Sequence, residues 1–238
     1  MRAFLAILRY DVDQLSRSWL VRIWVLLLVA PALFLIVVAA NEGEQASEVL
    51  AAYIAAVLAP FSGLAVSVIA TQAITGEAGV IADSILSKSV TRTEYMSAKI
   101  VSRMGVTLGI YVAVIVPFSY LIIRYGTSDT SLGGVTMGLL MVAMLLMFLA
   151  AFGIILSTLI RNVLVAVLVL LVGIVASGAA LQFLDLRWMS ATAVIYELPQ
   201  TFRGETPIWD QIRVLTVFPA LTAAAIFGSL WVFGRNDL

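Results

Sequence analysis

Few residues in this chain of 238 residues could carry out chemistry. It has no histidine and no cysteine, which excludes thiol chemistry, disulfides, zinc sites built on these residues and histidine triads. The nearest approach to an acid/base pair is Glu77 with Asp83, but their six-residue spacing places the carboxylates on opposing helix faces. Neither Lys88 nor Lys99 follows a glycine, so the chain has no ATP-binding P-loop. We therefore expect neither catalysis nor a cofactor site in this chain.

The composition is that of a membrane protein. Hydrophobic residues make up 62% of the chain and charged residues 12%, whereas a soluble domain usually has about 25% charged residues. The mean hydropathy is +1.08. The formal net charge is zero, so charge gives no indication of a nucleic-acid partner. The partner that composition indicates is the lipid bilayer.

The elements that position the few polar residues are long uncharged stretches. Six of them hold nineteen or more residues, namely 23–41, 49–76, 104–123, 130–160, 162–184 and 214–234. A helix of that length reaches about 28 Å, close to the ~30 Å of the bilayer core. A charge at mid-span costs about 2.5–3.5 kcal/mol, so such stretches rarely arise by chance. The sequence predicts an all-α integral membrane protein.

We expect a single transmembrane domain, 1–238, with six spans. Their predicted bounds are about 21–41, 50–74, 100–123, 134–159, 162–183 and 213–233. The basic residues indicate how the spans are oriented. Ten lie on the side of the two termini, namely Arg2, Arg9, Arg17, Arg22, Lys88, Arg92, Lys99, Arg103, Arg161 and Arg235. The opposite side has four, namely Arg124, Arg187, Arg203 and Arg213. The positive-inside rule thus predicts a multi-pass protein of the cell (inner or plasma) membrane with both termini in the cytoplasm.

Two segments outside the spans have amphipathic patterns. Residues 1–18 are predicted to form an interfacial helix with an apolar stripe of Phe4, Leu5, Leu8, Val12 and Leu15. Residues 185–212 alternate aromatic and charged residues. They are predicted to lie on, or dip into, the extracytoplasmic interface.

The main cytoplasmic loop is predicted to contain a short helix and a capped turn. Residues 77–87 place apolar side chains near one face at helical spacing. Thr91 and Glu94 have the spacing of a capping box, so a new helix should start near Arg92 and continue into the third span. Lys99 and Arg103 on that helix are expected to extend toward the membrane surface, as bases at a membrane edge do.

This loop resembles the permease subunit of ABC-2-type ABC transporters. In that family a Glu and a Gly follow span 2, and a pattern close to "iLS-Pvsr-eyl-gK" precedes span 3. The matching residues here are Glu77, Gly79, Ile85, Leu86, Ser87, Val90, Arg92, Glu94, Tyr95 and Lys99. Ser89 departs from the pattern, because the family usually has proline there. The specific match covers about 25 residues, and the layout of six spans extends it to the whole chain.

The resemblance implies that residues 77–98 form a coupling region that docks on a separate ATP-binding subunit. The candidate contact residues are Glu77, Ile85, Leu86, Lys88, Thr91, Arg92, Glu94 and Tyr95. ATP and magnesium would then bind to the partner subunit. The resemblance further implies a pair of permease subunits, with a homodimer favoured over a heterodimer, and a role as an exporter.

Other interpretations of the same residues stay open. The loop could instead pack against the cytoplasmic ends of neighbouring spans. The chain could be a scaffold or signalling subunit that a partner ATPase drives without substrate flux. A membrane enzyme is the weakest alternative, since no catalytic constellation is visible. The spans carry no charge near their centres, which argues against an ion-coupled carrier.

Overall fold

The structure is a computed structural model, and the regular elements that it describes are helices. It describes residues 2–75, 91–184, 186 and 189–235. In order, the helices are α1 (Arg2–Arg17), α2 (Trp19–Glu42), α3 (Ala46–Tyr53), a π-helical turn η1 (Ile54–Leu58), α4 (Ala59–Thr75), α6 (Arg92–Tyr125), α7 (Leu132–Leu159), α8 (Val163–Phe183), α9 (Ala191–Tyr196), α10 (Leu198–Arg203) and α11 (Ile208–Arg235). The described residues form no strand beyond one isolated β-bridge between Gln45 and Thr127.

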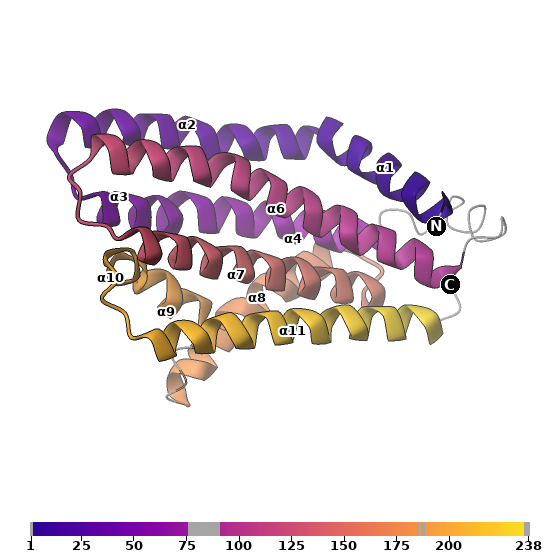
Figure 1. Cartoon of the computed structure of the whole chain (residues 1–238). Helices are drawn as coiled ribbons and strands as arrows, with labels where there is room; N and C mark the ends of the chain where they lie inside the picture. The colour runs from indigo at the N-terminus through magenta and orange to yellow at the C-terminus, as the bar shows by residue number, and fades with distance from the viewer. Residues whose placement is uncertain (1, 76–90, 185, 187–188, 236–238) are drawn as a thin grey trace.

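Six helical stretches of the described chain are long and apolar enough to cross a membrane, as predicted. They are Trp19–Glu42, Ala46–Ala73, Thr93–Tyr125, Leu132–Leu159, Val163–Phe183 and Ile208–Gly234. The second runs without a break through α3, η1 and α4. The two chain ends lie at the same end of the bundle (Figure 1), which we call the termini end. We call the opposite end, where α10 lies, the Arg203 end.

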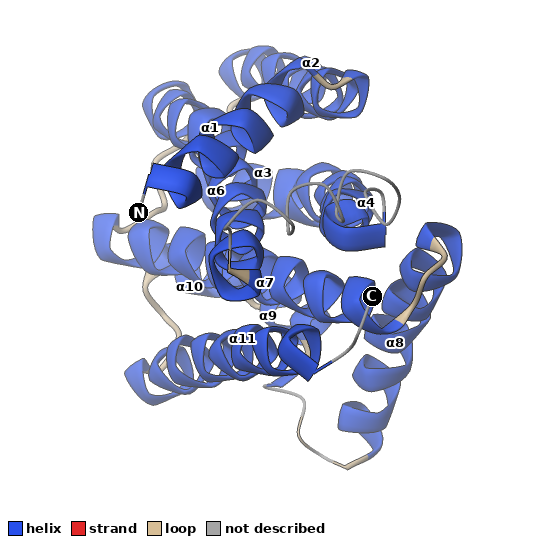
Figure 2. Cartoon of the chain, turned by 90° about the vertical axis from the view of Figure 1, so that its right-hand side faces the viewer, coloured by secondary structure: helices blue, strands red, loops and turns tan. Residues whose placement is uncertain are grey.

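The helix α7 is the centre of the bundle. It packs against α4, α6, α8, α10 and α11, and the view along the bundle shows the other helices around it (Figure 2). In the apolar stretch of α7 that could cross a membrane 61% of the residues are buried, whereas in the corresponding stretch of α8 11% are buried. α8 therefore presents most of its surface outward, while α7 is enclosed by protein.

Polar side chains fix the starts of several helices. The hydroxyl of Ser18 accepts the amide of Val21 at the start of α2. Ser131 and Asn162 accept amides in the first turns of α7 and α8 in the same way. Each cap satisfies an amide that has no partner within its own helix, which explains why the helices begin at these positions.

Buried polar groups inside the bundle are paired across helices. The indole nitrogen of Trp24 on α2 donates to the Ser62 hydroxyl on α4, over 3.2 Å. The hydroxyl of Tyr53 donates to the carbonyl of Leu28 over 3.1 Å. An unpaired polar group at bilayer depth is costly, so these bonds help to set how α2 lies against the second span.

The second span widens in its middle. Its π-helical turn ends two residues before Pro60, and the amide of Ala59 donates to the carbonyl of Ile54. Proline lacks an amide hydrogen and its ring crowds the preceding turn of an α-helix. A wider turn just before it relieves that conflict, and such turns occur often at functional sites.

Candidate functional site

Half of the eight predicted contact residues for an ATP-binding subunit lie outside the described part of the chain. These are Glu77, Ile85, Leu86 and Lys88, together with the predicted helix 77–87. Arg92 begins α6, although its side chain also lies outside the description. The contact itself therefore stays a prediction.

The predicted capping box at the start of α6 is confirmed. The amide of Glu94 donates to the Thr91 hydroxyl over 3.2 Å, and the amide of Thr91 donates back to the Glu94 carboxylate over 3.5 Å. Tyr95, the next residue, is buried, and its ring stacks on Phe233 of α11 at 6.1 Å. Within this chain the Tyr95 side chain is thus a packing residue between α6 and α11.

A buried ionic cluster joins α1 to α6 at the termini end. The ammonium of Lys99 donates to one oxygen of Asp11 over 2.6 Å, and the guanidinium of Arg103 lies 3.4 Å from the same oxygen. The Ser102 hydroxyl donates to the other oxygen of Asp11. The side chains of Asp11 and Lys99 are each 1% exposed and that of Arg103 is 7% exposed. We call Asp11, Lys99, Ser102 and Arg103 the Asp11 clamp.

The Asp11 clamp corrects the expectation that Lys99 and Arg103 extend toward the membrane surface. Both bases turn inward, because a desolvated carboxylate on α1 offers them a partner. The signal for it was present in the sequence. Asp11 lies four residues from both Ile7 and Leu15, in the middle of the apolar side of α1. An acid in such a place must find a base when the helix packs.

The predicted interfacial helix exists as α1, but only part of its apolar stripe is free. Leu15 is buried against the bundle, whereas Leu5 is 59% exposed and Val12 38% exposed. α1 packs on α6 and on α2, running beside the first turns of α6 (Figure 1). Its placement in the membrane interface stays a prediction.

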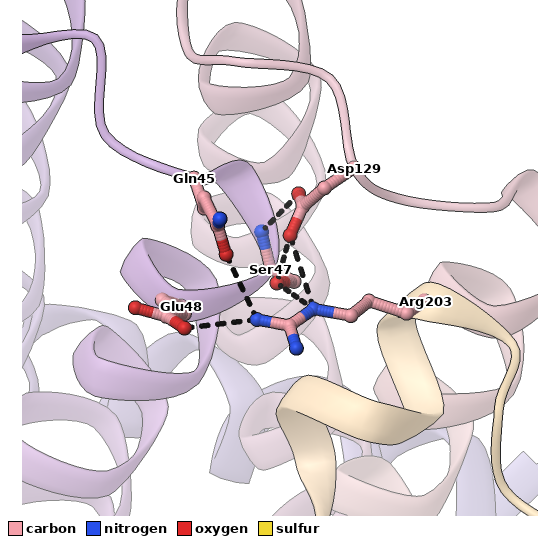
Figure 3. Close-up of polar contacts among 5 residues, drawn as sticks. All are labelled: Gln45, Ser47, Glu48, Asp129 and Arg203. Carbon is pink, nitrogen blue, oxygen red and sulfur yellow. Dashed lines mark hydrogen bonds and ion pairs between the residues drawn. The ribbon is translucent and has the colours of Figure 1, made fainter.

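A second polar cluster joins three segments at the Arg203 end (Figure 3). The guanidinium of Arg203, at the end of α10, donates to Asp129 over 3.2 Å and to the Ser47 hydroxyl over 3.0 Å. It also donates to Gln45 and to Glu48, over 2.9 Å each. Asp129 in turn accepts the amide of Ser47 over 2.9 Å, so it caps the start of α3 from the loop between α6 and α7. We call these five residues the Arg203 cluster.

The Arg203 cluster shifts the acid–base behaviour of its members. Partial burial alone would raise the pKa of Asp129, but the hydrogen bonds from Ser47 and Arg203 outweigh it, and the pKa lies below its ordinary value. The hydrogen bond to Asp129 raises the pKa of Arg203 in turn. Both groups are therefore charged at neutral pH. A guanidinium that donates to several acceptors at once fixes the geometry of the contact more closely than a single exposed ion pair does.

The pH dependence of stability follows from the lowered pKa of Asp129. Its contribution is fully present above the ordinary pKa of about 3.9 and is lost as the pH falls through the lower folded value. Asp129→Asn should cost about 1 kcal/mol at pH 7, since the site is partly screened, or about 2–4 °C in melting temperature. Thermal unfolding in detergent from pH 7 to pH 3 measures this.

The difference between Asp129→Asn and the unchanged chain should shrink below about pH 4. The control is Asp210→Asn, which removes an exposed pair with Arg213 at the same end of the bundle. A difference that stays constant over the whole pH range would contradict the assignment.

Glycines on α7 let α10 approach closely. A methyl group added at Gly134 would collide with the carbonyl oxygen of Thr201, and one at Gly138 with the ring of Phe202. The amide of Ser131 donates to the Phe202 carbonyl over 2.9 Å, and Phe202 is fully buried. α10 is thus held by its backbone against α7, which fixes where Arg203 points.

The segment 185–212 contains the short helices α9 and α10 in its described part. Its aromatic residues divide into two kinds. Phe202 is in the core, while Tyr196 is 77% exposed and Trp209 is 70% exposed. Some aromatic side chains of the segment are therefore exposed, as predicted for an interfacial segment, but Phe202 lies inside the bundle.

Neither cluster has the arrangement of a catalytic or metal site. In both, each carboxylate is paired with a base, so the oxygens are occupied by hydrogen bonds. No group of three or more acidic, histidine or cysteine side chains in the described ranges could hold a metal ion. What the clusters can do is connect helices across the bundle at its two ends. No protein-family model and no curated protein matches the chain.

Proposed function

We propose that this chain is the permease subunit of an ATP-driven transporter, an exporter that works as a pair of permease subunits with a separate ATP-binding subunit. The six apolar helices support the membrane part of this proposal. The ABC-2-like pattern of residues 77–99 supports the coupling part. The positive-inside rule favours the cytoplasm for the termini end, where an ATP-binding subunit would dock.

The observation that carries the proposal is the Asp11 clamp. A motor that closes on ATP needs a rigid path from its docking site into the spans. α6 begins with a capped turn inside the predicted coupling region, and two turns later Lys99 binds Asp11 on α1. A buried contact made of several hydrogen bonds and ion pairs holds the two helices in one arrangement. A push on the start of α6 would therefore move α1 and the third span together.

The test is a mild-detergent purification of the tagged chain from its host, with mass spectrometry of the proteins that remain bound. We expect a stoichiometric ATPase with a P-loop. The double variant Arg92→Glu/Glu94→Arg should lower its recovery by about tenfold or more, the effect of losing one central contact. Recovery that is unaffected by this change would contradict the docking site.

Two controls separate docking from folding. Asp13→Arg/Arg17→Glu exchanges an exposed ion pair at the same end of the bundle, with side chains 57% and 74% exposed, and should keep the ATPase. Glu94→Gln keeps the capping box, because glutamine also serves in it, so it tests the charge without unravelling α6. A chain that purifies with no ATPase would overturn the proposal as a whole.

A further inference from the structure

A cavity of about 500 Å³ lies between the second span, α7, α8 and α9. Pro60 and Gly63 form one wall, Phe148 of α7 another, and residues of α8 and α9 close it toward the Arg203 end. The cavity is open on one side, since Leu64, Val175 and Tyr196 in its lining are each more than half exposed. A space of this size is within the range of ligand pockets.

The chemistry of the walls selects an apolar, uncharged ligand. No charged side chain of the described residues lines the cavity, and most of its wall is Ala, Leu, Val, Ile and Phe. Such a cavity does not hold water well. An ionic head group inside it would lack a counter-charge, which is costly at this depth.

Hydroxyl groups gather at one end of the cavity. A methyl group on Gly178 would lie 3.5 Å from the Ser190 hydroxyl and 3.8 Å from the Thr192 hydroxyl, so both oxygens meet at this corner. Ser177 also lines this end and uses its hydrogen to bind the Ile174 carbonyl, which leaves its oxygen able to accept. These groups suit the neutral polar head of an amphiphile.

The exposure of α8 also favours entry of a ligand into the cavity from the bilayer. α8 is the least buried of the candidate spans in the described chain, so one side of the cavity is a helix that faces lipid. The opposite side includes Leu58 of the π-helical turn, together with Ala59 and Pro60 directly after it. The local break in the second span therefore lies against the cavity.

We propose that this cavity binds one uncharged single-chain lipid, with its acyl chain along Gly63 and Phe148 and its neutral head at Ser190 and Thr192. The site lies within one chain. Binding needs neither ATP nor a partner ATPase, so it can fail or hold independently of the transporter assignment.

The test uses the full chain in phosphatidylcholine nanodiscs with a monoacylglycerol that carries a diazirine on its acyl chain. After illumination, labelled peptides are mapped by mass spectrometry. We expect label on α4 and α7 residues that line the cavity, above that on the lipid-exposed residues of α2. Label spread evenly over outward-facing helices would overturn the proposal. So would the absence of label in the cavity, as expected if a second copy of the chain fills it.

Gly63 offers a selective way to close the site. Gly63 lines the cavity and a methyl group there meets nothing within 4 Å, so we expect the ring of Gly63→Phe to occupy part of the cavity. It should reduce the cavity label by about fivefold or more, a loss of about 1 kcal/mol in binding, and should not lower the melting temperature. Gly109→Phe is the matched control, because Gly109 is also unobstructed but lies on α6 away from the cavity. Equal labelling of both variants would overturn the site.

Two further probes test the polar end. The double variant Ser190→Ala/Thr192→Ala should weaken labelling by the monoacylglycerol and leave labelling by a diazirine alkane unchanged. A diazirine fatty acid, which is anionic at neutral pH, should label the cavity less than the monoacylglycerol does. Stronger labelling by the fatty acid would overturn the claim that the ligand is uncharged.

Discussion

Replacing Asp11 with asparagine is expected to lower the free energy of unfolding by about 3–5 kcal/mol, the usual effect of removing one partner of a buried ion pair. The amide would keep the shape of the side chain but leave the charges of Lys99 and Arg103 buried without a counter-charge. Unfolding of the purified chain in mixed detergent and dodecyl sulfate micelles measures the change.

The matched control lies two residues away on the same helix. Asp13→Asn removes an exposed ion pair with Arg17 and should change stability by about 0.5 kcal/mol or less. Lys99→Met gives a second comparison. It should cost less than Asp11→Asn, because Arg103 remains to pair with Asp11. Equal effects of the two aspartate changes would show that the clamp contributes little.

Replacing Gly134 with alanine should displace α10 from α7. The added methyl group would collide with the Thr201 carbonyl and lie 2.8 Å from the Phe202 carbonyl and 2.7 Å from the Ser131 hydroxyl. Two of these atoms are backbone and cannot move aside as a side chain can. Overpacking of this kind costs about 1–3 kcal/mol, and the Arg203 cluster should loosen with it.

The neighbouring Gly133→Ala is the control for that experiment. A methyl group at Gly133 meets nothing within 4 Å, and replacing a helical glycine by alanine adds about 0.5–1 kcal/mol of stability in general. The chain has no native cysteine, so Thr201→Cys, at a position 2% exposed, can report on α10. Maleimide should label it faster in Gly134→Ala and at the original rate in Gly133→Ala. Equal rates would contradict the role of Gly134.

The spans and the start of α6 could be predicted from the sequence because their signals are local. Charge-free stretches of membrane length predicted six spans, and the described chain has six helices long and apolar enough to cross a membrane. Thr91 and Glu94 are three residues apart, so their capping box depends on one helical turn alone. Local rules of this kind need no knowledge of how helices are arranged.

The clusters and the cavity could not be predicted in the same way. Lys99 is 88 residues from Asp11, and Arg203 is 158 residues from Gln45. Which acid meets which base depends on the order of helices around α7, and no periodic pattern in one helix encodes that order. Bases at a membrane edge also have two competing solutions, solvent and an internal acid, and a single sequence does not decide between them.

The separation of the paired residues along the chain also sets when each contact can form during biosynthesis. Domains begin to fold while the chain is still being made, from the N-terminus onward. The Asp11 clamp needs only the first 103 residues, so it can close once the third span has entered the membrane. The Arg203 cluster must wait until α10 has been translated, after five spans are in place. Its closure would mark a chain in which the second span, α7 and α10 have met in the correct order.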